Sequence, residues 1–121
     1  MMLSFRLLPQ YYDLVKSGKK YMEFRSITDY YVKKLMGGYA FSSESELQKF
    51  VEELKDKKLR DKAMKKSGAY FRCNSGHPTD YDKVRFFNKE GESMVFELKS
   101  IDFCASDSNL FVLTLGKKIN G

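Results

Sequence analysis

The opening stretch LSFRLLPQYYDLVKSGKKYMEFRS (residues 3–26) predicts a strand, a helix and a second strand, in that order. Apolar and polar residues alternate over Leu3–Leu7, which is typical of a half-buried strand. A proline stands at the start of the expected helix Pro9–Ser17, and Gly18 stands where a helix commonly stops. Alternation resumes over Tyr21–Arg25, which is the second expected strand.

The middle of the chain predicts helices. A short helix is expected over Tyr30–Met36, closed by a Gly-Gly pair. Ser43 and Glu46 form a capping box at the start of a longer helical segment. Its apolar stripe drifts near Asp56, so the segment is either one kinked helix or two helices that break there. We expect this helical insert to span about residues 42–67, with an acidic start and a basic end that suit the helix dipole.

The second half of the chain predicts strands. Alternation over Ala69–Cys73 and Lys83–Phe87 indicates two of them. A third strand, Met94–Phe103, shifts its apolar phase near Lys99, as a β-bulge would cause. The nearly all-apolar segment Leu110–Leu115 is expected to be a central strand buried on both faces. The chain is therefore expected to be α+β, and five of its strands are expected to share one barrel-like sheet (3–7, 21–25, 83–87, 94–103 and 110–115).

Length and composition narrow the classes of protein. The 121 residues suit a single domain over 1–121, and 22 basic against 16 acidic residues give a net charge of +6, which weakly favours an anionic partner. No apolar run is long enough to span a membrane, and we expect no membrane partner. The N-terminus does not resemble a signal peptide, so Cys73 and Cys104 are interpreted as reduced thiols of a cytoplasmic protein.

One spacing carries chemistry: Gly18, Lys20, Glu23 and Arg25 follow the first helix in the pattern Gly-x-Lys-x-x-Glu-x-Arg. Glu23 and Arg25 are two apart on a strand and so share one face, and Arg6 lies on the polar face of the first strand. Arginine offers a planar fork to a phosphate or base edge, lysine a mobile charge, and glutamate an acceptor for an amino group. The alternative is a solvated surface ion pair, worth at most about 1 kcal/mol.

This pattern resembles the signature of the ASCH domain, a branch of the PUA-like superfamily. The stretch LSFRLLPQYYDLVKSGKKYMEFRS is similar to that family's opening strand and helix, and DYDKVRFFN and LFVLTLGKKI are similar to its later barrel strands and C-terminal close. The resemblance covers roughly residues 3–27 and 80–119. It implies a PUA-like small β-barrel with flanking helices and a cleft beside the signature. Residues 28–79 then form a subfamily-specific insert.

The resemblance implies that the chain binds RNA or a nucleotide-like small molecule without a cofactor. The expected ligand-binding residues are Arg6, Lys20, Glu23, Arg25 and Ser26.

An enzyme is the first alternative. In the acetylcytidine amidohydrolase branch of the family, the signature lysine is catalytic and works with a hydroxyl residue and a later glutamate. Here Lys20 is present, but Glu23 takes the hydroxyl position, and the later acid cannot be assigned among Glu90, Glu92 and Glu97. Lys20 and Glu23 would be the catalytic pair of a nucleoside amidohydrolase or a ribonuclease.

A protein-interaction or inhibitor module is the second alternative, with the inserted helices over Glu44–Lys66 as its contact surface. The basic run Lys55–Lys66 is either a phosphate-binding patch or a solvated helix end. Cys73 and His77 are too few to form a metal site, so none is expected. Four aromatic residues are candidates for base stacking but more commonly belong to a core (Tyr30, Tyr31, Tyr70 and Phe87).

Overall fold

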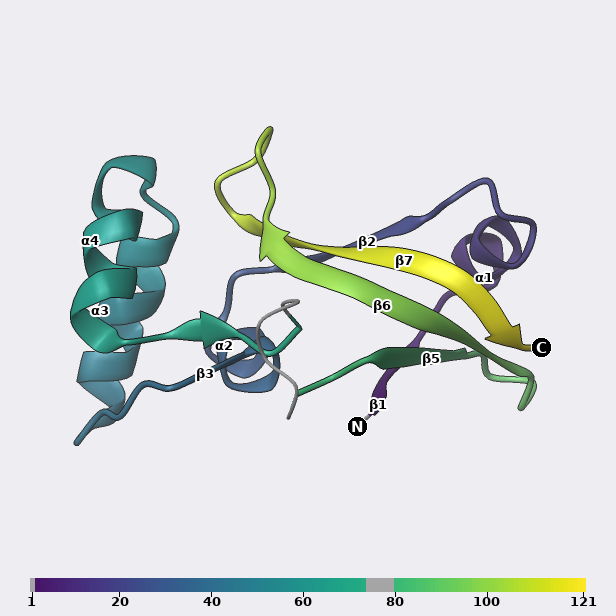
Figure 1. Cartoon of the computed structure of the whole chain (residues 1–121), viewed down its shortest axis with the longest axis horizontal. Coiled ribbons are helices and arrows are strands. Elements are labelled where there is room, and N and C mark those ends of the chain that lie inside the picture. The colour runs from purple at the N-terminus through teal and green to yellow at the C-terminus, as the bar shows by residue number, and fades with distance from the viewer. Residues whose placement is uncertain (1, 74–79) are drawn as a thin grey trace. The chain divides into compact units, whose positions relative to one another are not determined.

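The computed structural model describes residues 2–73 and 80–121, so His77 lies outside the described residues. The chain is α+β, as expected (Figure 1). Its elements follow one another as β1 (Met2–Arg6), α1 (Pro9–Lys16), β2 (Met22–Ser26), α2 (Asp29–Leu35), β3 (Met36–Gly37), α3 (Glu44–Leu54), α4 (Lys57–Ser67), β4 (Tyr70–Phe71), β5 (Lys83–Phe87), β6 (Ser93–Phe103) and β7 (Leu110–Asn120). Across these described ranges, no helix has both the length and the apolar character needed to cross a membrane.

Five strands form one sheet in the order β1-β5-β6-β7-β2. β1 pairs with β5 in parallel, with Met2 opposite Lys83, and β5 pairs with β6 in antiparallel. The prediction that these five strands share a sheet is therefore confirmed. β7 lies inside the strand order and not at an edge, as predicted for the apolar segment near the end of the chain.

The chain divides into two compact units. The first contains Met1–Glu23, Cys73–Ser100 and Leu113–Gly121, and the second contains Phe24–Arg72 and Ile101–Val112. Accordingly β1, α1 and β5 belong to the first unit, and α2, β3, α3, α4 and β4 belong to the second.

The first unit has an apolar core formed by alternating strand residues. Leu3 and Phe5 of β1 and Val84 and Phe86 of β5 are all buried, and the rings of Phe5 and Phe86 stack at 6.2 Å between centroids. The predicted helix is present as α1, with proline at its first position. Gly18 follows with a φ of +79°, a conformation that glycine adopts without strain.

The two long strands bear on two predictions. In β6 the buried positions shift from the even residues Met94, Phe96 and Leu98 to Ile101, so the predicted change of phase is confirmed. In β7 the prediction of burial on both faces is wrong. Phe111, Leu113 and Leu115 are buried, but the residues that alternate with them, such as Val112, are only half-buried. An all-apolar run does not show which of its faces lacks a covering layer.

The second unit contains a short two-stranded sheet. The helix expected to reach Met36 ends at Leu35, and Met36–Gly37 forms β3 against β4. The strand expected over Ala69–Cys73 is therefore only two residues long. Arg72 contributes to the early end of α2, because it binds the carbonyls at that end. Its backbone N–H donates to the Leu35 carbonyl and its Nε donates to the Met36 carbonyl, each at 2.9 Å.

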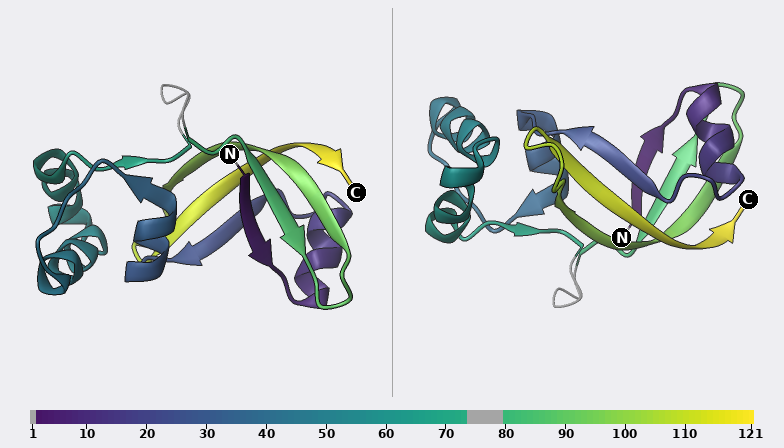
Figure 2. Two further views of the ribbon diagram at one scale, coloured as in Figure 1. Left: turned by 90° about the horizontal axis from the view of Figure 1, so that it is seen from below. Right: turned by 90° about the horizontal axis from the view of Figure 1, so that it is seen from above.

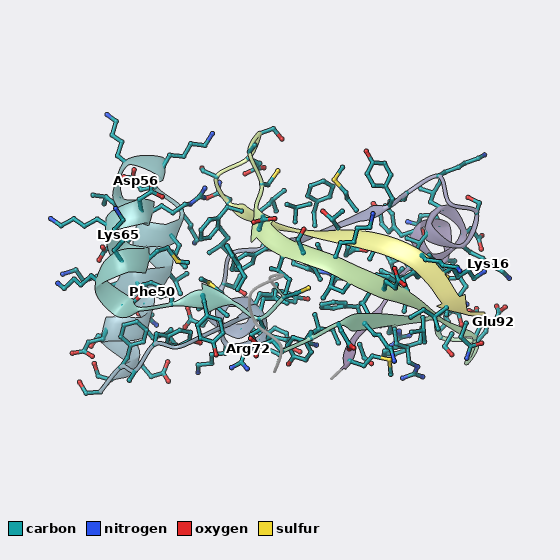
Figure 3. The ribbon with its side chains drawn as sticks, viewed as in Figure 1. Lys16, Phe50, Asp56, Lys65, Arg72 and Glu92 are labelled. Carbon is teal, nitrogen blue, oxygen red and sulfur yellow. The ribbon has the colours of Figure 1, made fainter. Side chains whose placement is uncertain are left out.

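The helical insert consists of two helices that lie side by side, not one kinked helix (Figure 2). The Ser43 hydroxyl accepts from the Glu46 N–H at 3.3 Å, as a capping box requires. The Glu46 carboxylate accepts from the Ser42 N–H at 2.9 Å, one residue earlier than expected. Asp56 lies in the turn between the helices (Figure 3) and caps α4 by accepting from the Lys58 N–H at 2.8 Å.

This break corrects the prediction about the helix dipole. With two helices, α3 has no basic residue in its last turn, and α4 begins with Lys57 and Lys58 at its positive end. The charge order suits the dipole only at the start of α3 and at the end of α4.

Candidate functional site

Lys20 and Glu23 form an ion pair in the first unit. The Lys20 Nζ lies 3.5 Å from Glu23 Oε2 and 5.1 Å from the centroid of the Tyr11 ring on α1. The backbone N–H of Lys20 donates to the Leu14 carbonyl at 3.2 Å, which fastens the turn after Gly18 to the end of α1. The Lys20 side chain is 24% exposed, so its ammonium group is both paired and accessible.

Glu23 is buried, although the sequence suggested a solvated strand face as the alternative. Glu23 is 5% exposed, whereas its neighbour Phe24 is 38% exposed. β2 therefore buries a carboxylate and exposes a phenyl ring, the reverse of what solvation favours. A buried carboxylate is costly unless it is paired, and Lys20 supplies the countercharge. The solvated-pair interpretation is thus wrong for Glu23.

Arg25 is held by α2 in the second unit. Its Nη1 donates to the Tyr31 hydroxyl at 3.1 Å, and its guanidinium carbon lies 5.7 Å from the Tyr31 ring centroid. Tyr31 is fixed in turn, because its backbone N–H donates to the Thr28 hydroxyl that caps α2. The Tyr30 ring packs edge-on against it at 4.9 Å. Sequence reasoning named Tyr31 as a stacking candidate but missed its role as the partner of Arg25.

The other two expected ligand-binding residues are exposed. Arg6 ends β1 opposite Phe87, and Ser26 ends β2. The convergence of Arg6, Lys20, Glu23, Arg25 and Ser26 in one cleft stays a prediction.

Two cavities that the sequence did not predict lie in the second unit. The first, of about 380 Å³, is lined by Ala40, Phe41, Glu46, Lys49, Phe50, Glu53, Ala63, Lys66 and Ser67. The second, of about 580 Å³, is lined by Lys33, Tyr39, Ala40, Phe41, Ser42, Ser43, Glu44 and Leu47.

Three rings that line these cavities form an aromatic cluster. The rings of Tyr39, Phe41 and Phe50 lie 5.2 to 5.7 Å apart between centroids. Burial raises the pKa of Tyr39, which Arg72 partly offsets. The only sequence signal was the pair of aromatic residues before the capping box.

The two cysteines are buried free thiols. The Cys104 Sγ lies 3.4 Å from the Ser106 hydroxyl. This hydrogen bond, together with hydrogen bonds from the backbone of Ser106 and Asp107, lowers the pKa of the Cys104 thiol. Cys73 donates to the Leu98 carbonyl at 3.3 Å. Within residues 2–73 and 80–121, no cluster of three or more histidine, cysteine, aspartate and glutamate side chains is placed to hold a metal ion.

Comparison of the chain with family models, with curated proteins and with solved structures found no match. The function is therefore argued from the residues and their geometry.

Proposed function

We propose that this chain is an RNA- or nucleotide-binding protein of the ASCH type, with a PUA-like barrel, and that Lys20, Glu23 and Arg25 contact the ligand. The observation that carries the proposal is the burial of Glu23 in contact with Lys20, at the two signature positions. The buried carboxylate lies beside a partly exposed cation, on a strand that exposes a phenyl ring. A site that reads an exocyclic amino group would need this acceptor held away from water.

The neighbouring side chains have complementary roles in this proposal. The Lys20 ammonium, 24% exposed beside Glu23, is a mobile donor for a phosphate. Arg25 has a planar fork, and its bond to Tyr31 limits the orientations of that fork before ligand arrives. Arg6 and Ser26 add a second cation and a hydroxyl.

The test is a pair of substitutions at Arg25. Arg25→Lys keeps the charge and loses the fork, so it should cost about 1–3 kcal/mol of binding if Arg25 makes a bidentate contact. Arg25→Ala should also lower the salt dependence, by about 0.7 for each phosphate of a single strand that is no longer neutralised. Both variants are titrated against a labelled RNA pool at two salt concentrations.

The matched control is Arg85→Lys, since Arg85 is a half-buried strand arginine that also stacks on an aromatic ring, at 5.1 Å from the Phe87 centroid. It should bind RNA like the wild type. Wild-type affinity in both Arg25 variants would remove Arg25 from the site.

A hydrolase is the second candidate, because the Lys20 Nζ lies 3.5 Å from the Glu23 carboxylate and could exchange a proton with it. The binding proposal predicts no product from N-acetylcytidine or from RNA. Turnover that disappears in Lys20→Ala and persists in Lys19→Ala would replace it with the hydrolase.

A further inference from the structure

Most of the net charge of the chain lies on one helix. α4 contains six basic residues and one acidic residue, a balance of +5, and the whole chain has +6. The rest of the chain is therefore close to neutral.

The lysines of α4 share one side of the helix, here called the lysine face (Lys57, Lys58, Lys62, Lys65 and Lys66). At 3.6 residues per turn, these positions fall within about half of the circumference. All five are exposed, while Arg60 and Ala63 on the opposite side are buried. Lys65, labelled in Figure 3, marks this face.

The stability of the helix explains only part of the lysine face: Lys65 and Lys66 suit the dipole, and Asp61 lies four residues from both Lys57 and Lys65. Lys57 and Lys58 lie in the first turn, where the dipole opposes positive charge. Lys58, Lys62 and Lys66 follow one another at four-residue spacing, which places like charges next to each other at a cost of about 0.2–0.5 kcal/mol per pair.

Arg60 holds α4 with the lysine face outward. Its Nε donates to the Leu54 carbonyl at 2.7 Å, and its Nη2 donates to the Ser108 carbonyl at 2.9 Å. Its guanidinium carbon lies 4.0 Å from the centroid of the Phe103 ring. Arg60 therefore anchors the helix and turns the lysine face to solvent.

The lysine face adjoins an aromatic cavity. Lys66 also lines the cavity of about 380 Å³, together with Phe41, Phe50 and Lys49. Positive charge alone suits any polyanion, including an acidic protein. Positive charge next to aromatic rings is typical of surfaces that bind single-stranded nucleic acid, because a base has a face to stack and an acidic side chain has none. Glu46 and Glu53 at the same cavity add acceptors for amino groups of a base.

We infer that α3 and α4 form a second contact surface for single-stranded RNA, in which the lysine face binds phosphates and the cavity beside Phe41 receives a base. The inference takes RNA as the ligand from the proposed function, but it uses different residues.

The experiment measures binding of a labelled single-stranded RNA of about 12 nucleotides across a series of salt concentrations. The test variant replaces Lys58, Lys62 and Lys66 by glutamine. The control variant replaces the exposed lysines Lys16, Lys83 and Lys89 by glutamine and so changes the net charge equally. The slope of log affinity against log salt should fall by about 2 in the test variant, at about 0.7 for each phosphate that the three lysines bind, and should stay near the wild-type value in the control.

The cavity has its own variants. Phe41→Leu keeps an apolar lining but removes the ring, so affinity should fall about five- to a hundredfold with the salt slope unchanged. Phe41→Tyr should restore the affinity. Circular dichroism checks that each variant is folded.

The outcomes separate this inference from the proposed function. An equal fall of the salt slope in the test variant and the control variant would overturn the inference. A wild-type salt slope in a test variant that still binds RNA through Arg25 would also overturn it. Displacement of the RNA by polyglutamate at equal charge concentration, with Phe41→Leu silent, would overturn it in favour of an acidic protein partner. If Arg25→Ala binds RNA like the wild type while the salt slope falls in the test variant, the inference stands and the proposed site at Lys20, Glu23 and Arg25 fails.

Discussion

At the scale of single residues, the most informative side chain is Glu23. Strand periodicity assigned it correctly to the same face as Arg25, but it could not show that this face is the covered one. The exposed ring of Phe24 has the same origin, because β2 places successive residues on opposite sides. Periodicity alone therefore does not show whether a charged residue of an alternating strand is solvated or buried.

Cys104 leads to a prediction about pH. Its hydrogen bond with Ser106 lowers the thiol pKa below the ordinary value of 9.0. The folded chain therefore releases this proton at a lower pH than the unfolded chain. The free energy of unfolding should rise with pH between the lowered pKa and 9.0, stay level above it, and lose this contribution as pH falls through the lowered pKa.

The measurement compares urea unfolding of the wild type and of Cys104→Ala from about pH 6 to about pH 9. The stability difference between the two should grow with pH. A difference that is flat across this range would show that Ser106 does not favour the thiolate. Thiolate absorbance in a Cys73→Ser background gives an independent value of the Cys104 pKa.

At the scale of elements, the turn after β3 depends on Gly38. Its φ is +83°, and a β-carbon there would lie 2.6 Å from both the Gly68 carbonyl oxygen and the Tyr70 ring. Gly91 has the same φ of +83° with nothing within 4 Å, which makes it a matched control. Gly91→Ala should cost about 1–2 kcal/mol from the left-handed backbone alone.

Gly38→Ala should cost clearly more than Gly91→Ala, by about 1–3 kcal/mol, because β4 must move to make room. Chemical denaturation of the two variants checks this. Equal losses of unfolding free energy in the two variants would mean that the β3–β4 sheet accommodates the added methyl group without a loss of stability.

The elements that could be predicted from the sequence are those defined by residues close to one another in the chain. Lys83–Phe87 matches β5 in full, since its alternation and its flanking turn are local signals. The sequence pattern allows either a kink or a break at Asp56. The hydrogen bond from the Lys58 N–H to the Asp56 side chain, which starts a new helix, decides for the break. The parallel pairing of β1 with β5, the two-residue length of β4 and both cavities depend on distant contacts, so no local pattern contains them.

At the scale of the whole molecule, the concentration of charge on α4 predicts a trade between stability and binding. The glutamine triple at Lys58, Lys62 and Lys66 relieves two like-charge pairs and lowers the net charge from +6 to +3. Loss of Lys66 from the last turn of α4 offsets part of this relief, so at low salt the free energy of unfolding should rise by at most about 0.7 kcal/mol.

Thermal unfolding at two salt concentrations tests this. The gain should shrink at high salt, and the control triple at Lys16, Lys83 and Lys89 should gain less, because its charges are dispersed. A lysine-face variant that is less stable than the wild type would assign these lysines a structural role.

The pairing of β1 with β5 also has a consequence for biosynthesis. β1 leaves the ribosome long before its neighbour in the sheet, which begins at Lys83. During translation the apolar side of β1, with Leu3 and Phe5, lacks its β5 neighbour until synthesis has passed Phe87. The short α1 that follows β1 can form from local contacts, whereas the pairing of β1 with β5 waits for a later, non-local step. Slow translation before the codon for Lys83 should therefore prolong the period in which nascent chains are exposed to chaperones and to aggregation.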